Sequence, residues 1–399
     1  MKKTLLFQLM FVVAVQAWTQ RTVVSGTVVH ATTNEPVAGA SVTMNNLSVV
    51  TNEDGFFTLK SEREAETITV SHVGYRLQQV KVTGQPLKIR LQPATIQLQE
   101  VLVTANDPRE LVSRAIDKIP NNYSQRPELH RCFYREKAMK RQHYVSVAEG
   151  VIDMYKTGYQ RDVSRDKVAI RKGRRLMSPK QKDTLGIKVL GGPVTSIELD
   201  LVKNTEFLFN GKELDHYDLH MESPTIIGGR RQFVVSLRPR TLLPYALFFG
   251  KLYIDQETLA FTRAELSLDM SNREKATRVM LVKKPLGVRF RPRELSFVVD
   301  YKQGADGLTR ISYLSTTFRF NCDWKRRLFA TSFAAFCEMA ITSTTADDVK
   351  PISGRESFDQ RDAFFDKVDY FRDPDFWQDY NIIEPSESLD KAVGRLLKN

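Results

Sequence analysis

The chain has little cysteine: only Cys132, Cys322 and Cys337 occur in 399 residues. Three thiols allow at most one intramolecular disulfide, and there is no Cys-x-x-Cys pair, so a disulfide scaffold and dithiol redox chemistry are excluded. Cys322 and Cys337 flank a predicted hairpin, but a turn near 325–328 would place them out of register. We therefore predict three buried free thiols, with a single bridge as the alternative.

Motifs for common catalytic chemistry are also missing. The sequence has no His-Glu-x-x-His, no Gly-x-Ser-x-Gly and no Gly-x4-Gly-Lys-Ser/Thr. His216 and His220 are four apart and share a face of either a helix or a strand, which permits a metal site, but polar loop residues are the default interpretation. Asp255 and Glu257 lie in a predicted turn and give no positive support for a carboxylate pair. We predict no cofactor and no metal, assign no catalytic residue, and favour a protein that is not an enzyme.

Long apolar runs are confined to the first twenty residues. Lys2 and Lys3 precede an apolar stretch over 5–15, and Val15-Gln-Ala17 is a small-residue cleavage pattern. This predicts a signal peptide over 1–20, with an N-terminal membrane anchor as the alternative. No later stretch approaches the roughly 18 apolar residues of a spanning helix. We expect an exported mature chain without a transmembrane segment, in the periplasm or at the periphery of the outer membrane.

Charge is distributed unevenly. Residues 105–345 carry 42 Lys and Arg against 27 Asp and Glu, whereas residues 346–399 carry 8 against 13. The export signal argues against nucleic acid as the partner of this basic region and favours an anionic lipid, an acidic glycan or the acidic tail itself. A solvated basic surface is the alternative. One candidate anion site is the cluster of Trp324, Lys325, Arg326 and Arg327. The alternative interpretation of this cluster is a solvated hairpin tip.

Residues 21–104 show short alternating segments separated by turn signals, which is typical of a β-sandwich. Four motifs follow in order: Val-x-Gly-x-Val at 24–28, Pro-Val-x-Gly-Ala-x-Val at 36–42, Thr-Asn-x-Asp-Gly-x-Phe at 51–57 and Val-Gly-Tyr at 73–75. Together they resemble the carboxypeptidase-regulatory-like domain, a transthyretin-like sandwich of exported Bacteroidota proteins. The resemblance implies a cell-envelope setting and an interaction module for a protein partner. It does not imply peptidase activity.

Residues 105–345 are predicted to form a larger antiparallel domain. Asp107 caps a helix over 108–119, which we expect to cover one face of a sheet. Apolar and polar residues alternate with period two over 251–255 and 260–268, which predicts a long hairpin with one face exposed to solvent. Strands over 277–283 and 293–301 are expected to follow it.

Two stretches of this region are less regular. Residues 161–190 are a basic segment predicted to be a loop, and residues 194–220 are ambiguous between helix and short strands. A sheet of this many strands has to twist strongly, curl or close.

The run Leu-Tyr-Ile-Asp-x-Glu-Thr-Leu-Ala-Phe-Thr-Arg-Ala-Glu at 252–265 and the curled sheet resemble lipoprotein-carrier half-barrels. Residues 100–399 are similar to a Bacteroidota envelope family without an assigned activity, through Phe-Tyr-Arg-Glu at 133–136, the segment 322–330 and the segment 375–385. This resemblance supplies no site residues. Residues 346–399 are predicted to be an acidic tail that ends in a short helix, is anchored by its aromatic residues and folds back on the basic region.

The sequence therefore predicts a mainly β protein, with a transthyretin-like sandwich followed by a curved half-barrel-like α+β domain. We expect an exported binding or scaffolding protein that holds a lipid or a peptide in the curved sheet. The alternative is a hydrolase or transferase acting on envelope glycan or peptide, which predicts clustered polar residues with perturbed pKa in a cleft.

Overall fold

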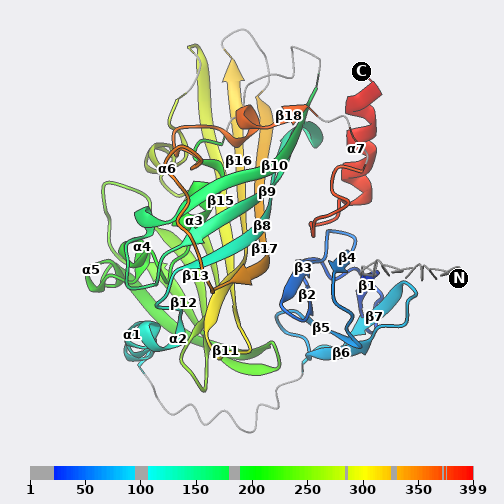
Figure 1. The fold of residues 1–399 in the computed structure, drawn as a ribbon. Coiled ribbons are helices and arrows are strands. Elements are labelled where there is room, and N and C mark those ends of the chain that lie inside the picture. The colour runs from blue at the N-terminus through cyan, green and yellow to red at the C-terminus, as the bar shows by residue number, and fades with distance from the viewer. Residues whose placement is uncertain are drawn as a thin grey trace, which may run out of the picture.

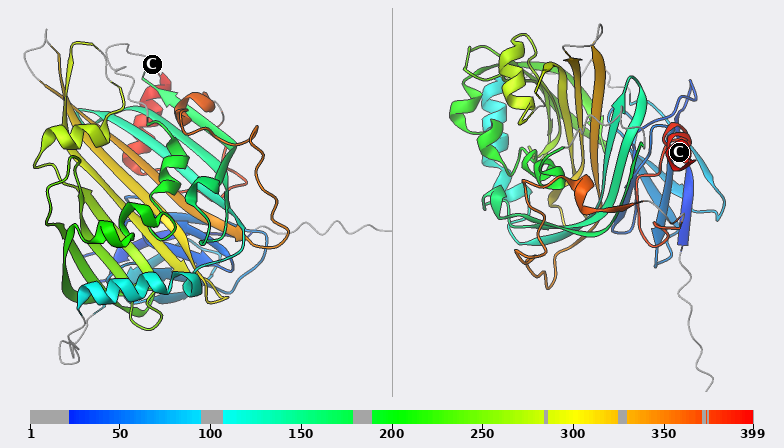
Figure 2. Two further views of the ribbon diagram at one scale, coloured as in Figure 1. Left: turned by 90° about the vertical axis from the view of Figure 1, so that its left-hand side faces the viewer. Right: turned by 90° about the horizontal axis from the view of Figure 1, so that it is seen from above.

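A computed structural model of the chain describes residues 22–94, 107–178, 189–283, 286–324, 330–370, 373 and 375–398. A small N-terminal sandwich lies against the convex side of a large curved antiparallel sheet, and helices lie on its concave side (Figure 1, Figure 2). The predicted fold class, mainly β with a half-barrel-like sheet, is confirmed. No helix among these residues is long and apolar enough to cross a membrane.

The N-terminal sandwich consists of two sheets around one apolar core. One sheet has the order β4-β1-β7 and the other the order β3-β2-β5-β6. Inward positions alternate along the strands, as in β4, where Phe57 and Leu59 are buried. The strands are β1 (Thr22–His30), β2 (Ser41–Met44), β3 (Leu47–Val50), β4 (Phe56–Ser61), β5 (Thr67–Ser71), β6 (Gln78–Lys81) and β7 (Leu87–Leu91).

The turn before β4 forms as its residues predict. Asn52 Oδ1 accepts hydrogen bonds from the backbone N–H groups of Asp54 (3.0 Å) and Phe56 (2.9 Å). Gly55 has φ +73°, and a Cβ atom there would lie 2.4 Å from the carbonyl oxygen of Val28. This position therefore requires glycine.

The large sheet runs in the order β11-β12-β13-β14-β15-β16-β17-β8-β9-β10-β18. All neighbours pair antiparallel except β10 and β18. The strands are β8 (Glu128–Lys140), β9 (His143–Lys156), β10 (Lys167–Met177), β11 (Tyr217–Ile227), β12 (Arg230–Pro239), β13 (Phe248–Asp255), β14 (Phe261–Leu268), β15 (Val288–Gln303), β16 (Thr309–Trp324), β17 (Thr331–Thr345) and β18 (Asp369–Tyr370).

The predicted hairpin over 251–268 is present as β13 and β14, with Leu252 opposite Ala264. The strand predicted over 277–283 is wrong, because this segment contains helix α6 (Arg273–Met280). Asn272 caps the helix by accepting hydrogen bonds from the N–H groups of Glu274 and Lys275. Ala276 is fully buried against the sheet, so the apolar residues follow the helical period rather than the period of a strand.

The loop predicted over 161–190 is also wrong where β10 forms. β10 pairs with β9 along ten residue pairs, and its basic side chains find carboxylates on that neighbour. Arg171 Nε lies 2.5 Å from Asp153 Oδ2, and Arg174 Nε lies 3.0 Å from Glu149 Oε2. Residues 167–177 of the basic segment are therefore a strand with paired arginines rather than a solvated connection, and residues 179–188 lie outside the described residues.

Helices cover the concave face of the sheet (Figure 2). Asp107 caps α1 through the N–H of Arg109, and α1 lies where the covering helix is predicted. Side chains from these helices and their connections, among them Leu111 of α1 and Val202 between α3 and α4, are buried against strand residues such as Val299 and fill this face. The helices are α1 (Pro108–Asp117), α2 (Ile119–Asn122), α3 (Gly192–Glu198), α4 (Thr205–Leu208) and α5 (Gly211–Leu214).

The C-terminal strap, residues 375–386, lies between the sandwich and the large sheet and leads into α7 (Glu387–Lys398). Trp377 is buried beside Phe133 of β8, with ring centroids 5.7 Å apart. Lys60 of the sandwich donates to the Trp377 carbonyl (2.8 Å). A bridge between Leu47 of β3 and Ser343 of β17 joins the two sheets directly.

The three cysteines are free and buried, as predicted. Burial raises the pKa of the Cys322 thiol to about 11, so it stays protonated at neutral pH. The boundaries proposed for the domains at residues 20, 104 and 345 stay predictions.

Candidate functional site

The candidate anion site of the sequence lies mostly outside the described residues. Lys325, Arg326 and Arg327 are not among them. Trp324 ends β16, is half-buried, and its ring lies 6.1 Å from that of Phe333. This site therefore stays a prediction. His216, from the possible metal pair, contacts the Thr241 hydroxyl (3.1 Å), and His220 is exposed on β11.

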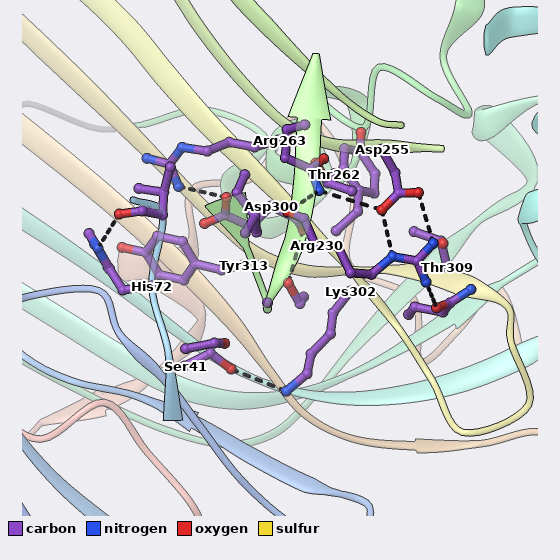
Figure 3. A pocket seen from close by; sticks show the side chains of 18 of the residues that line it. Ser41, His72, Arg230, Asp255, Thr262, Arg263, Asp300, Lys302, Thr309 and Tyr313 are labelled. Atoms are coloured by element: carbon purple, nitrogen blue, oxygen red, sulfur yellow. Dashed lines mark hydrogen bonds and ion pairs between the residues drawn. The ribbon is translucent and has the colours of Figure 1, made fainter. Parts of the chain in front are cut away.

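The structure places a different polar cavity between the two parts of the molecule. This junction pocket has a volume of about 270 Å³ and lies between the β2 and β5 side of the sandwich and strands β12 to β16 of the large sheet (Figure 3). Its charged and polar lining includes Ser41, His72, Arg230, Arg263, Asp300 and Lys302. The predicted hairpin face with Arg263 forms part of its wall.

Two arginines of the junction pocket are fully paired. Arg230 Nε lies 2.7 Å from Asp255 Oδ2, and its Nη2 lies 3.0 Å from Glu257 Oε2. Arg263 bridges two carboxylates, with 2.6 Å to Glu265 Oε1 and 2.6 Å to Asp300 Oδ1. These guanidinium groups are held by short charge-assisted bonds and have their charge matched. They shape the wall of the pocket more than they offer free positive charge.

Lys302 differs from these two arginines, because its partners are hydroxyl groups rather than carboxylates. It lies on β15, and its side chain reaches across the pocket to hydroxyl groups of β2, at 3.4 Å from Ser41 Oγ and in contact with Thr43 Oγ1 (Figure 3). Within the described part of the chain, no carboxylate lies at ion-pair distance from its ammonium group. Burial lowers the pKa of Lys302 to about 8. Lys302 is half-buried, and a partly desolvated cation with hydroxyl groups as its partners is costly unless it loses its proton or gains an anion.

Two other titratable groups of the junction pocket are His72 of the sandwich and Asp300, which lies two residues before Lys302 on β15. Burial, followed by the nearby Arg263 charge, lowers the pKa of His72, so this imidazole is neutral at pH 7. Its Nδ1 lies 3.0 Å from the Val73 carbonyl oxygen, which it reaches as a donor in the neutral tautomer. Burial raises the pKa of Asp300, and Arg263 opposes this shift. His72 therefore adds no charge to the junction pocket, and the carboxylate of Asp300 is paired with Arg263.

A second polar cluster lies inside the half-barrel. This core network consists of Lys156, Asp166, Asp200 and Lys203, all buried. Lys156 Nζ lies 2.5 Å from Asp200 Oδ2 and 3.6 Å from Asp166 Oδ2, and Lys203 Nζ lies 2.7 Å from Asp166 Oδ1. Tyr301 donates to Asp200 Oδ1 (2.8 Å). Two cations thus meet two anions, and each carboxylate accepts further hydrogen bonds.

The pKa values of the two core lysines differ. Burial opposes the charged form of Lys156, but Asp200 and then Asp166 outweigh it and raise its pKa. Burial, and then repulsion by Lys156, lower the pKa of Lys203 to about 8. The core network is a closed structural unit, because its side chains are enclosed by apolar neighbours and helices.

Sequence reasoning missed the junction pocket. A signal was present, because Arg263, Asp300 and Lys302 are charged residues on strands with alternating burial, which the pattern assigns to the wet face. The pocket exists because the sandwich covers that face. Nothing in the local pattern of either segment indicates that covering.

Comparison with known families identifies the N-terminal part of the chain. Residues 24–103 match the CarboxypepD_reg-like domain. This confirms the resemblance that the four motifs carry. No curated protein matches the chain.

Several solved structures are similar to the larger part. An outer membrane lipoprotein-sorting protein domain from Vibrio parahaemolyticus is 9% identical over 62% of this chain and 96% of its own, with a TM-score of 0.30. A DUF1329 family protein from Desulfovibrio piger is 10% identical over 61% of this chain and 95% of its own, with a TM-score of 0.26. A LolA superfamily protein from Nitrosomonas europaea is 12% identical over 58% and 94%, with a TM-score of 0.19.

Proposed function

We propose that this chain is a binding protein of the cell envelope, and that its junction pocket takes a small anionic ligand or the anionic group of a larger one. The observation that carries the proposal is Lys302, whose half-buried side chain ends in an ammonium group with hydroxyl partners and no carboxylate among the described residues. An anion in the pocket supplies the missing charge. Ser41 and Thr43 then act as further hydrogen-bond donors to it.

The chemistry of the pocket limits the ligand class. Among the described residues that line the pocket, Lys302 is the cation without a carboxylate partner, because Arg230 and Arg263 are already paired. The cavity of about 270 Å³ lies near the lower end of ligand-pocket sizes. A single carboxylate, phosphate or sulfate group fits this site better than a polyanion. Acidic glycans and lipid headgroups both present such groups.

Titration calorimetry on the mature chain tests this proposal, with glycerol 3-phosphate, glucuronate and inorganic phosphate as probes. We expect at least one probe to bind, and Lys302→Met to abolish its binding, whereas the exposed Lys251→Met on β13 leaves it unchanged. An anion binds the charged lysine, so its affinity falls as pH rises above about 8, by up to about tenfold per unit. Equal binding by the Lys302→Met chain contradicts the proposal.

We also propose that the curved sheet holds a lipid or a peptide. The concave face is filled by side chains of α1 to α5, so an acyl chain there has to displace one or more of these helices. Native mass spectrometry of protein purified gently from its own envelope tests this. A mass excess that extracts into organic solvent supports a bound lipid, and a bare chain contradicts it. Export is tested in the same preparation, since the mature N-terminus is expected just after residue 17 to 20.

Catalysis on envelope glycan or peptide is the second candidate, because the junction pocket does cluster polar groups with shifted pKa. The two candidates differ in their pH dependence. Anion binding needs the charged Lys302 and weakens above pH 8, whereas nucleophilic or base chemistry needs the neutral amine and strengthens there. A rate of glycan or peptide turnover that rises through pH 8 and is lost in Lys302→Met would favour catalysis.

A further inference from the structure

Just over half of the exposed large apolar side chains of the described residues lie in one stretch of the chain. Of the eleven large apolar residues that are exposed in the described structure, six lie between residues 242 and 286. Leu242 is 97% exposed, Val282 is 83% exposed and Leu286 is fully exposed. Single exposed apolar residues are ordinary, but a group of this kind marks an interaction surface. We call Leu242, Tyr245, Val279, Val282 and Leu286 the apolar rim.

The segments that carry the apolar rim are joined in space. Lys275 of α6 donates to the carbonyl of Leu243, and the N–H of Asp269 donates to the carbonyl of Leu247 (2.9 Å). Below them, Ala276 is buried together with Leu268 and Leu295. The rim therefore rests on a packed apolar base at one end of β13, β14 and β15, where Figure 1 shows α6 away from the N-terminal sandwich.

Basic residues surround the apolar rim. Residues 269–293 carry eight Lys and Arg against two Asp and Glu. Arg273, Arg278, Lys283 and Arg289 are all exposed. Glu274 pairs with Arg278 at 2.9 Å and leaves a large excess of positive charge.

We propose that the apolar rim docks this protein on the surface of an anionic phospholipid bilayer. Protruding leucine and valine side chains enter the interfacial layer, and the surrounding Arg and Lys contact lipid phosphates. The charge excess selects an anionic partner. A bilayer accepts separate protruding side chains without a preformed pocket, whereas a protein partner needs a surface complementary to each of them. The rim is distinct from the junction pocket, and its docking stands or falls independently of ligand binding there.

Vesicle co-sedimentation of the mature chain tests the docking. We compare phosphatidylcholine vesicles with and without phosphatidylglycerol, at low and high salt. Binding is expected only with the anionic lipid and is expected to decrease with salt, because Arg and Lys contacts to phosphate are screened. Replacing the three most exposed rim residues together, Leu242→Ser, Val282→Ser and Leu286→Ser, is expected to reduce partitioning by about tenfold or more.

Two further variants make the result specific. The first is a triple variant that carries Arg273→Gln, Arg278→Gln and Lys283→Gln. It is expected to bind vesicles more weakly at low salt, while its thermal unfolding stays unchanged. Val23→Ser removes an exposed apolar residue of β1 outside the rim and is expected to bind as the unaltered chain does. Failure of the unaltered chain to bind anionic vesicles overturns the proposal. Equal binding by the rim variant also overturns it.

A fluorescence measurement covers the case in which a triple variant folds poorly. Leu286→Trp is expected to shift its emission to the blue on adding anionic vesicles, and Val23→Trp is expected not to shift. If the unaltered chain instead self-associates, and the rim variant is monomeric without any vesicle effect, the rim is an interface between copies and the bilayer proposal is wrong.

Discussion

The core network buries its lysine side chains and the junction pocket holds the half-buried Lys302, and the two sites surround these cations with different partners. In the core network, Lys156 lies 2.5 Å from Asp200 and within ion-pair distance of Asp166. In the junction pocket, Lys302 meets only the hydroxyl groups of Ser41 and Thr43. The pKa of Lys156 is raised, whereas the pKa values of Lys203 in the same network and of Lys302 are both lowered to about 8. The two sites are therefore distinguished by the carboxylate partners of their lysines, and not by the pKa values.

This difference separates a structural site from a site that can bind. Buried charges that are matched by opposite charges have nothing left to offer a ligand, and breaking one partner leaves an uncompensated charge. A lysine without a carboxylate retains both its charge and its hydrogen-bond donors for an incoming anion. Burial alone therefore does not identify the functional lysine, and its partners do.

The largest effect is expected from opening the core network. Asp200→Asn removes the closest counter-charge of Lys156 and is expected to destabilise the protein by about 3–5 kcal/mol in denaturant unfolding. Glu274→Gln on the exposed face of α6 is the control and is expected to cost less than about 1 kcal/mol. A cost for Asp200→Asn as small as that of the control would show that the core network is not charge-coupled.

Lys302→Met is expected to change the free energy of unfolding in the opposite direction, so that the protein becomes more stable. The folded state lowers the pKa of this lysine from 10.5 to about 8, which corresponds to a penalty of roughly 3 kcal/mol on the charged form. Removing the charge is expected to stabilise the protein at pH 7 by up to that amount.

The pH dependence of stability follows from the same shift. Between pH 8 and 10.5 the unfolded chain binds more protons at Lys302 than the folded chain does, so stability rises with pH across this window. In Lys302→Met this contribution is expected to disappear. Identical stability curves of the two chains between these pH values would contradict the lowered pKa.

Ser41→Asp is designed to convert the junction pocket into a matched pair like that of the core. The new carboxylate faces Lys302 and is expected to raise the pKa of this lysine. Because the carboxylate pairs with the ammonium group, the affinity for an anionic probe is expected to fall by about tenfold or more. Calorimetry checks the affinity, with Ser41→Asn as the uncharged control of similar size. Equal loss of affinity in both variants would point to steric blocking instead.

The smallest effect is expected at an exposed ion pair between the sandwich and the large sheet. Glu53 Oε1 lies 3.0 Å from Lys137 Nζ, and its side chain is 58% exposed. Glu53→Gln is expected to cost less than about 1 kcal/mol in denaturant unfolding, because Lys137 also faces Glu338 and water screens the pair. A cost comparable to that of Asp200→Asn would mean that exposure does not separate weak pairs from strong ones here.

Much of the architecture could be predicted from the sequence, because it depends on patterns among residues that are close together in the chain. Period-two burial in 251–255 and 260–268, the cap at Asp107 and the turn at Asn52 each follow from a few adjacent residues. It failed for α6, where the β-branched residues Thr277 and Val279 suggest a strand and burial of Ala276 under the sheet favours the helix.

β10 was missed for a related reason. Its basic residues look solvated until β9 supplies Asp153 and Glu149 as partners, and these carboxylates lie about twenty residues earlier in the chain. Neither strand by itself shows that the charges will be matched. Only their antiparallel register brings them together.

By itself, the sequence determined the domain family of residues 24–103, the two faces of the hairpin over 251–268 and the cap of α1, because each depends on neighbours a few positions away. Tertiary structure decided which polar face is covered. Arg263 and Lys302 lie on faces that alternation assigns to water, and the sandwich and its β2 hydroxyl groups close over them. The candidate site arises from docking between surfaces distant in sequence, which no local pattern encodes.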